Sequence, residues 1–390
     1  MISVDEALGH VFALAQPLGT ETVPLRQAAG RVLAEPIVAS RAHPPFATST
    51  MDGYAIATES VRIHDTFQVI GEAAAGHRFN DDVAAGQAVR IFTGAPIPPG
   101  TRRVVIQEDT RHNGSRISIS SDPNSSLNIR PDGTDFKVGS MIAAPRLLSP
   151  SDVALIASMN QVEIVVSRKP VVALIATGDE LVMPGEAPGA DQIIASNALG
   201  LAAMVEAAGG IARVLPIARD KVESLQSVFD LAKGADLVVT IGGASVGDHD
   251  LVGQVAEMRG MERAFYKVAM RPGKPLMAGQ LEGSAILGLP GNPVSSIICG
   301  RIFMLPMMAA MQGLPAKAPE RMTAMLGAAI CRNGPREHYM RARRTGDRVV
   351  VADCQDSGLL SVLADANALV VRPPNDPAKT AGDVVDVLDL

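Results

Sequence analysis

The chain has 390 residues, of which 47% are apolar and 19% are charged, and its formal net charge is −6. A chain of this length is expected to fold as roughly two to four domains, and the composition is typical of a soluble globular protein. The acidic balance and the lack of a long basic run argue against a general nucleic-acid-binding protein.

The cysteines and the N-terminus predict the compartment. Cys299, Cys331 and Cys354 lack the spacing of metal ligands and are odd in number, so we expect reduced structural thiols in a reducing compartment. The N-terminal sequence has neither the basic segment nor the apolar core of a signal peptide, and no stretch is expected to span a bilayer. The sequence therefore predicts a cytoplasmic protein without membrane or nucleic-acid partners.

Three helical segments are expected in the first 160 residues. Ser3 and Glu6 have the spacing of a capping box, which predicts a helix that continues to about Leu14. A second helix is expected over residues 25–34, and a third, short helix over residues 150–159. The third would return to the layer formed by the first two.

The segment between these helices is expected to be rich in strands. Residues 43–55 have no helical or strand periodicity, and Asp52 within them is a candidate functional residue, because a carboxylate among apolar and hydroxyl side chains needs a partner. Residues 55–144 contain short strand-like runs separated by proline and glycine turns, which indicates an all-β insert. Thr93 and residues 130–137 lie in polar loops, for which solvated turns are the alternative interpretation.

The clearest α/β region begins at Lys169, where apolar strands alternate with helices. This alternation predicts parallel strands joined by right-handed crossovers. The expected strands are residues 171–176, 213–217, 237–241, 263–269 and 284–289. After residue 315 only short strands are expected, so the tail should be a small β domain.

The loops that follow these strands predict a binding site. In a parallel sheet such loops meet at one edge, where ligands bind. Together they carry carboxylates, cations and glycines, as a phosphate ester with a divalent metal would require. The loops are residues 177–180, 218–220, 242–250, 270–275 and 289–293. The glycine turn at 242–250 precedes a helix and so favours an anion, although glycines used only for packing remain an alternative.

Several longer motifs then point to a known family. They are PPFATSTMDGYA at 44–55, FTGAPIP at 92–98, RPDGTDFKVG at 130–139, TGDEL at 177–181, TIGGASVGDHD at 240–250, RPGKP at 271–275 and LPGNPVS at 289–295. With these motifs in the same order, the chain resembles the molybdopterin molybdenumtransferases, the MoeA and gephyrin E-domain family, over essentially its whole length.

The resemblance implies a multidomain α/β and β protein. It has a helical linking layer (1–43 and 145–168), an inserted β domain (44–144), a three-layer α/β molybdopterin-binding domain with a parallel sheet (169–314) and a small β-barrel-like C-terminal domain (315–390). The family also implies an elongated homodimer, in which β domains of the partner chain complete the active cleft. Transient contact with other molybdenum cofactor enzymes is a further expectation.

The same match implies the site residues. The expected catalytic residues are Asp52, Asp135, Glu180, Asp220, Asp250, Lys267 and Lys274, of which Glu180, Asp220 and Asp250 would bind Mg²⁺. The expected binding residues are Thr93, Arg130, Gly242, Gly243, Ser245, Gly247, Arg271, Pro275, Arg341 and Ser357. Arg271 stands where the family more often has lysine, so it keeps the charge but adds a planar fork.

The implied activity is the insertion of molybdate into adenylylated molybdopterin, with release of AMP and a requirement for Mg²⁺. An adenylyltransferase that makes the adenylylated pterin is one alternative, although the additional β domains disfavour it. A non-catalytic molybdopterin carrier or scaffold is the other.

Overall fold

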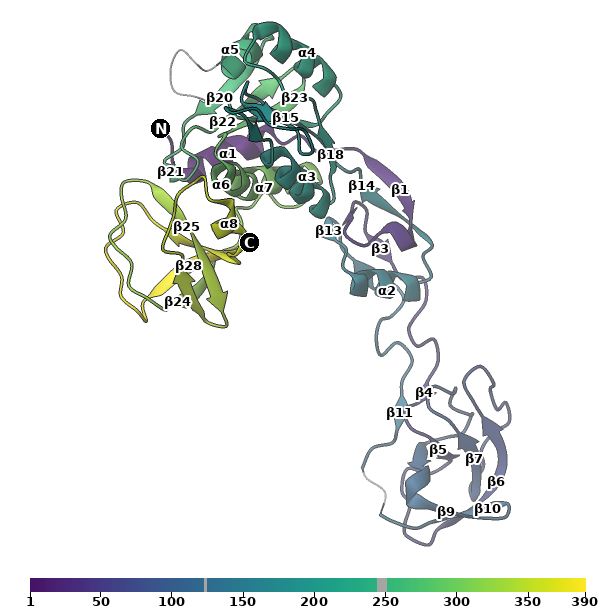
Figure 1. Cartoon of the computed structure of the whole chain (residues 1–390). Coiled ribbons are helices and arrows are strands. Elements are labelled where there is room, and N and C mark those ends of the chain that lie inside the picture. The colour runs from purple at the N-terminus through teal and green to yellow at the C-terminus, as the bar shows by residue number, and fades with distance from the viewer. Residues whose placement is uncertain (123–124, 244–250) are drawn as a thin grey trace. The chain divides into compact units, whose positions relative to one another are not determined.

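A computed structural model describes residues 1–122, 125–243 and 251–390 of the chain (Figure 1). These residues form two compact units. The larger unit comprises Met1–Ala34, Pro145–Ser149 and Ile164–Leu390, and the smaller comprises Glu35–Ala144 and Pro150–Glu163. The finer division into four domains stays a prediction.

The helices fall mainly in the larger unit. They are α1 (Val4–Leu14), α2 (Pro150–Ser158), α3 (Asn197–Ala207), α4 (Val222–Ala232), α5 (Leu251–Met258), α6 (Pro293–Cys299), α7 (Leu305–Met311) and α8 (Leu360–Ala364). The predicted capping box of α1 is confirmed, because Ser3 Oγ accepts from the Glu6 amide and Glu6 accepts from the Ser3 amide.

The helix expected over residues 25–34 is wrong. A 3₁₀ turn spans Leu25–Gln27, and the following residues form strand β2 (Val32–Leu33). Both residues of β2 are buried and pair with neighbouring strands, so tertiary pairing overrides the local helical pattern. The resulting sheet has the order β1-β14-β2-β13, with β1 (Thr20–Pro24), β14 (Glu163–Ser167) and β13 (Arg146–Leu147).

A six-stranded sheet forms the centre of the larger unit, in the order β18-β15-β19-β23-β22-β20. Its strands are β15 (Val171–Ala176), β18 (Ile211–Val214), β19 (Leu237–Ile241), β20 (Glu262–Tyr266), β22 (Met277–Leu281) and β23 (Ser284–Leu289). The first three of these, together with β23, pair in parallel as predicted.

Strand β22 was not expected from the sequence. It forms an antiparallel hairpin with β23 through Glu282 and Gly283, whose φ angles of 50° and 86° suit a two-residue hairpin turn. Because β22 also runs antiparallel to β20, β20 keeps the direction of β23. The loop after β20 therefore still opens at the predicted edge.

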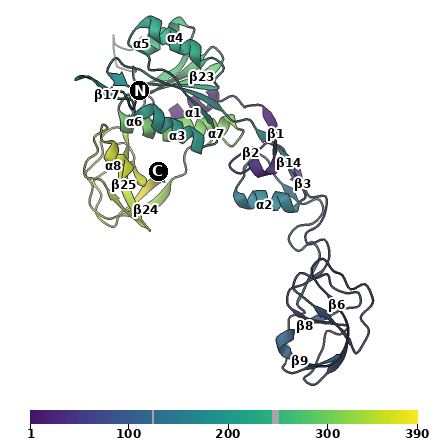
Figure 2. The ribbon, with the colours of Figure 1, turned by 45° about the vertical axis from the view of Figure 1, so that its right-hand side comes forward.

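Helices cover both faces of this sheet, which gives three layers (Figures 1 and 2). One face packs against α1, α3, α6 and α7, and the other packs against α4 and α5. Along β15, Leu174 belongs to the first core cluster and Ala173 and Ile175 to the second. A strand buried on both faces explains the continuous apolar run.

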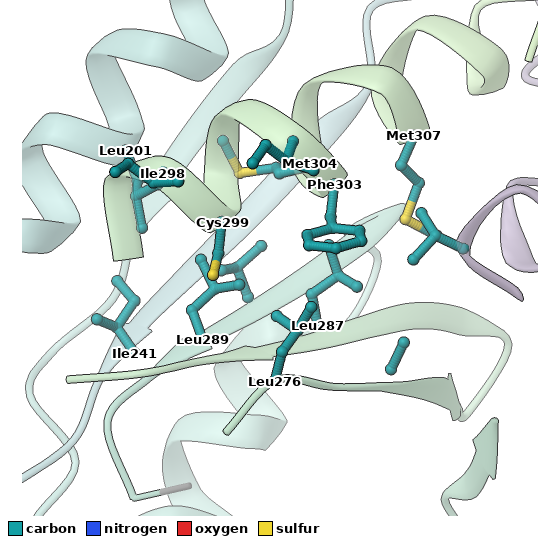
Figure 3. Close-up of a cluster of buried hydrophobic side chains, with 14 of the residues drawn as sticks. Leu201, Ile241, Leu276, Leu287, Leu289, Ile298, Cys299, Phe303, Met304 and Met307 are labelled. Carbon is teal, nitrogen blue, oxygen red and sulfur yellow. The ribbon is translucent and has the colours of Figure 1, made fainter. Parts of the chain in front are cut away.

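The helical stretch Pro293–Met311 is long and apolar enough to span a bilayer by length and composition, contrary to the sequence-based expectation. In this fold 72% of that stretch is buried. Figure 3 shows Cys299 and Phe303 pointing from it toward Leu289 and Leu287 of the sheet. Its apolar character is therefore explained by the protein core.

The cysteines are free thiols. Cys299 is buried, and burial raises its pKa far above the ordinary range, as expected for a structural thiol. Cys331 and Cys354 are exposed, so the structural role predicted for all three applies to Cys299 alone.

The C-terminal sheet closes into a five-stranded barrel, which confirms the predicted small β-barrel. Its strands are β24 (Met322–Leu326), β25 (Glu337–Thr345), β26 (Arg348–Val351), β27 (Ala368–Arg372) and β28 (Val384–Asp389). A sixth strand, β21 (Met270–Arg271), comes from the loop after β20 and pairs in parallel with β25. The α/β region and the barrel thus share a strand pairing.

The smaller unit is built mainly of β structure. Its main sheet has the order β8-β5-β7-β6-β10-β9, with β5 (Gly53–Ile56), β6 (Thr66–Ala73), β7 (Gln87–Ile91), β8 (Arg103–Ile106), β9 (Thr110–Asn113) and β10 (Arg116–Ile119). Two short ribbons pair β4 (Thr48–Ser49) with β11 (Ile129–Arg130) and β3 (Ile37–Val38) with β12 (Met141–Ile142).

Candidate functional site

A cavity of about 760 Å³, here called the main cavity, lies at the carboxyl edge of the α/β sheet. The loops after β15, β18, β19 and β23 line it, together with the start of α3 and β17 (Ile193–Ile194), which pairs with β16 (Leu181–Val182). Of the predicted site residues it brings together Glu180, Asp220, Gly242, Gly243 and Pro275.

Two glycines at the end of β19 are required by close packing. Gly242 and Gly243 have φ angles of 94° and 65°. A Cβ on Gly242 would lie 2.8 Å from the Thr177 carbonyl oxygen, and one on Gly243 would lie 2.2 Å from Val252 Cγ2. Packing explains both glycines, and the same tight turn lets the backbone form part of the cavity wall.

Glu180 and Asp220 place two carboxylates on one side of the main cavity. Burial, followed by the charges of Asp179 and Glu180, raises the pKa of Asp220, while the Asp220 amide donates to Asp179 Oδ1 at 3.2 Å. Carboxylates that raise one another's pKa favour a bound cation. The described residues nevertheless contain no group of three acidic, histidine or cysteine side chains arranged as a metal site.

A second cavity of about 390 Å³, here called the basic cavity, adjoins the first and shares Pro275, Pro290 and Asn292 with it. The predicted residues Arg271, Lys274, Pro275 and Ser357 line it. Asn292 Nδ2 donates to Ser357 Oγ at 3.1 Å, so the loop after β23 contacts the barrel here. Asp356 adds one carboxylate to the wall.

Sequence reasoning missed Arg336, which also lines the basic cavity. Its Nη1 donates to the carbonyl oxygen of Met270 at 3.2 Å. Arg336 lies just before β25, whose pairing with β21 brings it beside Arg271 and Lys274. Its position depends on a long-range strand pairing, which no local pattern signals.

The positive charge around this cavity is strong enough to affect a neighbour. Burial, followed by Arg271 and Arg336, lowers the pKa of His338 to about 4, so this imidazole is neutral at neutral pH. Such a surplus of cations suits an anionic ligand.

Arg341, which the resemblance implied as an anion-binding residue, is buried in the C-terminal barrel and does not line the basic cavity. Its side chain is 2% exposed. The Arg341 amide donates to Gln355 Oε1 at 2.9 Å, and Nη1 donates to the Leu359 carbonyl oxygen at 3.3 Å. Arg341 therefore holds the segment that carries Ser357, and burial lowers its pKa.

Within residues 169–314, four other predicted residues are not among the described residues that line these cavities. Lys267 is described but is not among the lining residues, and its Nζ lies 4.9 Å from the ring centroid of Tyr266. Ser245, Gly247 and Asp250 lie outside the described residues.

The smaller unit brings Asp52 and Thr93 together. Asp52 Oδ1 accepts from the Thr93 amide at 2.7 Å and from Thr93 Oγ1 at 2.8 Å. These hydrogen bonds, and then the charge of Arg90, lower the pKa of Asp52. The Arg90 guanidinium lies 5.0 Å from the Tyr54 ring and 4.8 Å from the Phe92 ring, which fixes it beside this pair.

Arg130 and Asp135 lie on the surface of the same unit. Both side chains are exposed. Arg130 pairs with Thr48 in the β11–β4 ribbon, and the Asp135 amide donates to the His43 carbonyl oxygen at 3.0 Å. Their side chains are thus available to a ligand.

A pH prediction follows from the Asp52–Thr93 hydrogen bonds. A carboxyl group with a pKa below the usual 3.8 stays ionised from pH 5 to pH 8. Asp52→Asn should therefore lower turnover by the same factor across that range, as measured from the pH–rate profiles of both proteins. A factor that changes with pH would mean that Asp52 titrates there.

Comparison with known proteins identifies the family. Residues 2–160 match the family model of the MoeA N-terminal region (domains I and II), residues 173–310 match a probable molybdopterin binding domain, and residues 323–390 match the MoeA C-terminal region (domain IV). The molybdopterin molybdenumtransferase of Haemophilus influenzae is 32% identical, over 99% of this chain and 98% of that protein. The chain belongs to the MoeA family.

Other MoeA-family proteins are similar over the same extent. The molybdopterin molybdenumtransferase of Nostoc sp. is 32% identical over 100% of this chain and 94% of that protein. The crystal structure of a molybdopterin biosynthesis MoeA protein from Pyrococcus horikoshii superimposes with a TM-score of 0.85 at 27% identity, covering 100% of both chains. The resemblance and the fold inferred from the sequence are thus confirmed.

The residues that line the two cavities fall in two of the matched regions. All residues that line the main cavity fall within 173–310, the probable molybdopterin binding domain. The basic cavity adds Arg336 and Ser357 from the MoeA C-terminal region.

Proposed function

We propose that this MoeA-family chain is a molybdopterin molybdenumtransferase that inserts molybdate into adenylylated molybdopterin and releases AMP. The observation that carries the proposal is the pair of adjoining cavities, one with carboxylates and the other with three cations, which share Pro275, Pro290 and Asn292. Two substrates of different chemistry would then meet at the shared wall.

The main cavity suits the adenylylated pterin. Its size is within the range of small-molecule sites, and it combines apolar side chains with backbone groups of glycine turns. Asn197 lines it and donates to the Gly291 carbonyl oxygen at 2.7 Å, which ties the start of α3 to the loop after β23.

The acidic residues fit Mg²⁺ by the chemistry of their donors. Mg²⁺ is commonly held by one or two carboxylates together with phosphate oxygens of the substrate. Glu180 and Asp220 would supply these carboxylates, and the raised pKa of Asp220 supports a favourable place for a cation. The bound ion would offset the charge of the pyrophosphate. Asp250 is proposed as a further ligand.

The basic cavity suits molybdate, a tetrahedral dianion. Arg271 and Lys274 of one loop and Arg336 from just before β25 supply positive charge along its wall, and the Ser357 hydroxyl adds a polar group. Charge-assisted hydrogen bonds are the strong ones, so these cations would account for most of the affinity. Asp356 would limit the net positive charge.

The assay that tests the function follows AMP. The protein should release AMP from adenylylated molybdopterin only when molybdate is added together with Mg²⁺. Synthesis of adenylylated pterin from ATP and molybdopterin would instead indicate an adenylyltransferase. Binding of the pterin without turnover would indicate a carrier.

We further propose a homodimer in which the smaller unit of one chain completes the main cavity of its partner. Asp52, Thr93, Arg130 and Asp135 would then act across the interface. If Asp52→Ala and Asp220→Ala proteins are mixed, each mixed dimer should contain one intact site. Random exchange would make half of the dimers mixed, so AMP release should recover to about one quarter of the wild-type rate. No recovery after demonstrated subunit exchange would place both residues in a site of one chain.

A further inference from the structure

The side chain of Arg219 connects two loops of the main cavity. Its Nη1 donates to the carbonyl oxygens of Gly178, Asp179 and Leu181 at 3.4, 3.0 and 3.0 Å. These three carbonyl groups lie on both sides of Glu180 in the sequence. One guanidinium therefore fixes the backbone around a residue that lines the cavity.

Two further hydrogen bonds, one between backbone groups and one from a backbone amide to a carboxylate, also join these loops. The Gly178 amide donates to the Ala218 carbonyl oxygen at 3.1 Å, and the Asp220 amide donates to Asp179 Oδ1 at 3.2 Å. These contacts hold Gly178 and Asp179 but do not reach Leu181. Arg219 extends the connection past Glu180.

The two connected loops carry like charges. Glu180 and Asp220 both line the main cavity, and Asp179 lies next to them, so the two connected loops bring three carboxylates together. Arg219 brings positive charge to this group, while the hydrogen bonds of its Nη1 go to carbonyl oxygens. These three hydrogen bonds therefore do not involve the carboxylate oxygens of Glu180 and Asp220.

We propose that Arg219 is a positioning residue, which holds residues 177–181 against residues 218–220 so that Glu180 and Asp220 face the charged phosphate region of the substrate together. This inference rests on the proposed function for the identity of the ligand. All three hydrogen bonds come from one terminal nitrogen, Nη1, so the contact depends on the reach of the long arginine side chain to that point.

Two substitutions test the role, with a matched control. Arg219→Met removes the charge and the donors, and Arg219→Lys keeps the charge and N–H donors on a shorter side chain. Arg213→Met is the control, because Arg213 likewise donates to backbone carbonyl oxygens, those of Leu231 and Lys233, away from the cavity. The first measurement is amide hydrogen exchange of residues 177–181 without substrate.

We expect exchange of residues 177–181 to be about tenfold faster in Arg219→Met than in wild type, since loss of a charged hydrogen bond weakens local structure. Mg²⁺ binding measured by calorimetry in the presence of the substrate should weaken by a similar factor. The half-saturating molybdate concentration should stay unchanged, because the basic cavity is intact. Arg219→Lys should fall between the two proteins, and Arg213→Met should resemble wild type.

If the folded Arg219→Met protein shows the same amide hydrogen exchange rates at residues 177–181 as the wild type, the inference is overturned. Weakened binding of molybdate and Mg²⁺ alike would also overturn it, because it would indicate general structural damage. The exchange measurement does not depend on turnover. If exchange rises but wild-type protein releases no AMP, the loop connection stands and the proposed function fails.

Discussion

Asp220→Ala is expected to reduce AMP release on the order of 100-fold or more, because removing a group that holds a charge-stabilising metal has effects of this size. Asp220 lines the main cavity with Glu180, and burial followed by the charges of Asp179 and Glu180 raises its pKa. The half-saturating Mg²⁺ concentration should rise together with the loss of turnover. Titration of AMP release against Mg²⁺ measures both effects.

A surface carboxylate provides the control for this experiment. Asp230 of α4 is exposed and forms ion pairs with Lys233 and Arg259, which directly follow α4 and α5, so Asp230→Ala should leave the Mg²⁺ dependence unchanged. The thermal midpoint of Asp220→Ala should stay near that of wild type, because Asp220 lies in a loop at the edge of the sheet and not in either core cluster. Near-wild-type turnover of Asp220→Ala at low Mg²⁺ would contradict the metal assignment.

Lys274→Ala and Arg336→Ala should each raise the half-saturating molybdate concentration by about tenfold to 100-fold, since a charge-assisted hydrogen bond is worth about 1.5–3 kcal/mol. Both residues line the basic cavity. Maximal AMP release should recover at high molybdate if these cations only bind the anion. Arg271→Lys keeps the charge and should have a much smaller effect.

Variants of two other arginines distinguish a loss of molybdate binding from a loss of stability. Arg332 is exposed in the same C-terminal region, and Arg332→Ala should leave molybdate saturation unchanged. Arg341→Ala should lower the thermal midpoint, because it removes a buried group that bonds Gln355 and Leu359. An unchanged half-saturation in Lys274→Ala and Arg336→Ala would remove molybdate from the basic cavity.

The position of the main cavity could be predicted because it depends on local patterns. Each apolar run followed by a polar, glycine-containing loop predicts a buried strand and its exposed end. Parallel pairing then brings Glu180, Asp220 and Gly242 to one edge, whatever the exact helix packing. The unexpected strand β22 left that edge unchanged, because the chain reverses direction once between β20 and β22 and again between β22 and β23.

The basic cavity could not be predicted fully, because its residues meet through long-range pairing. Arg336 and Arg341 are five positions apart in a region of several arginines, and sequence reasoning chose the second. In the fold, β25 buries Arg341 in the barrel and leaves Arg336 before its first residue, beside Met270. The helix predicted over residues 25–34 was wrong for a similar reason, because strand partners distant in sequence determine the conformation of Val32 and Leu33.

The pairing of β21 with β25 has a consequence for how this chain can evolve. Met270 and Arg271 align with Glu337 and His338, so a loop of the molybdopterin-binding region takes its backbone partners from the barrel. Recombination that exchanged the barrel as a module would leave this loop without its partner strand. We therefore expect changes around residues 270–275 and 336–338 to be inherited together, and swapped barrels to function only when both segments come from the same parent.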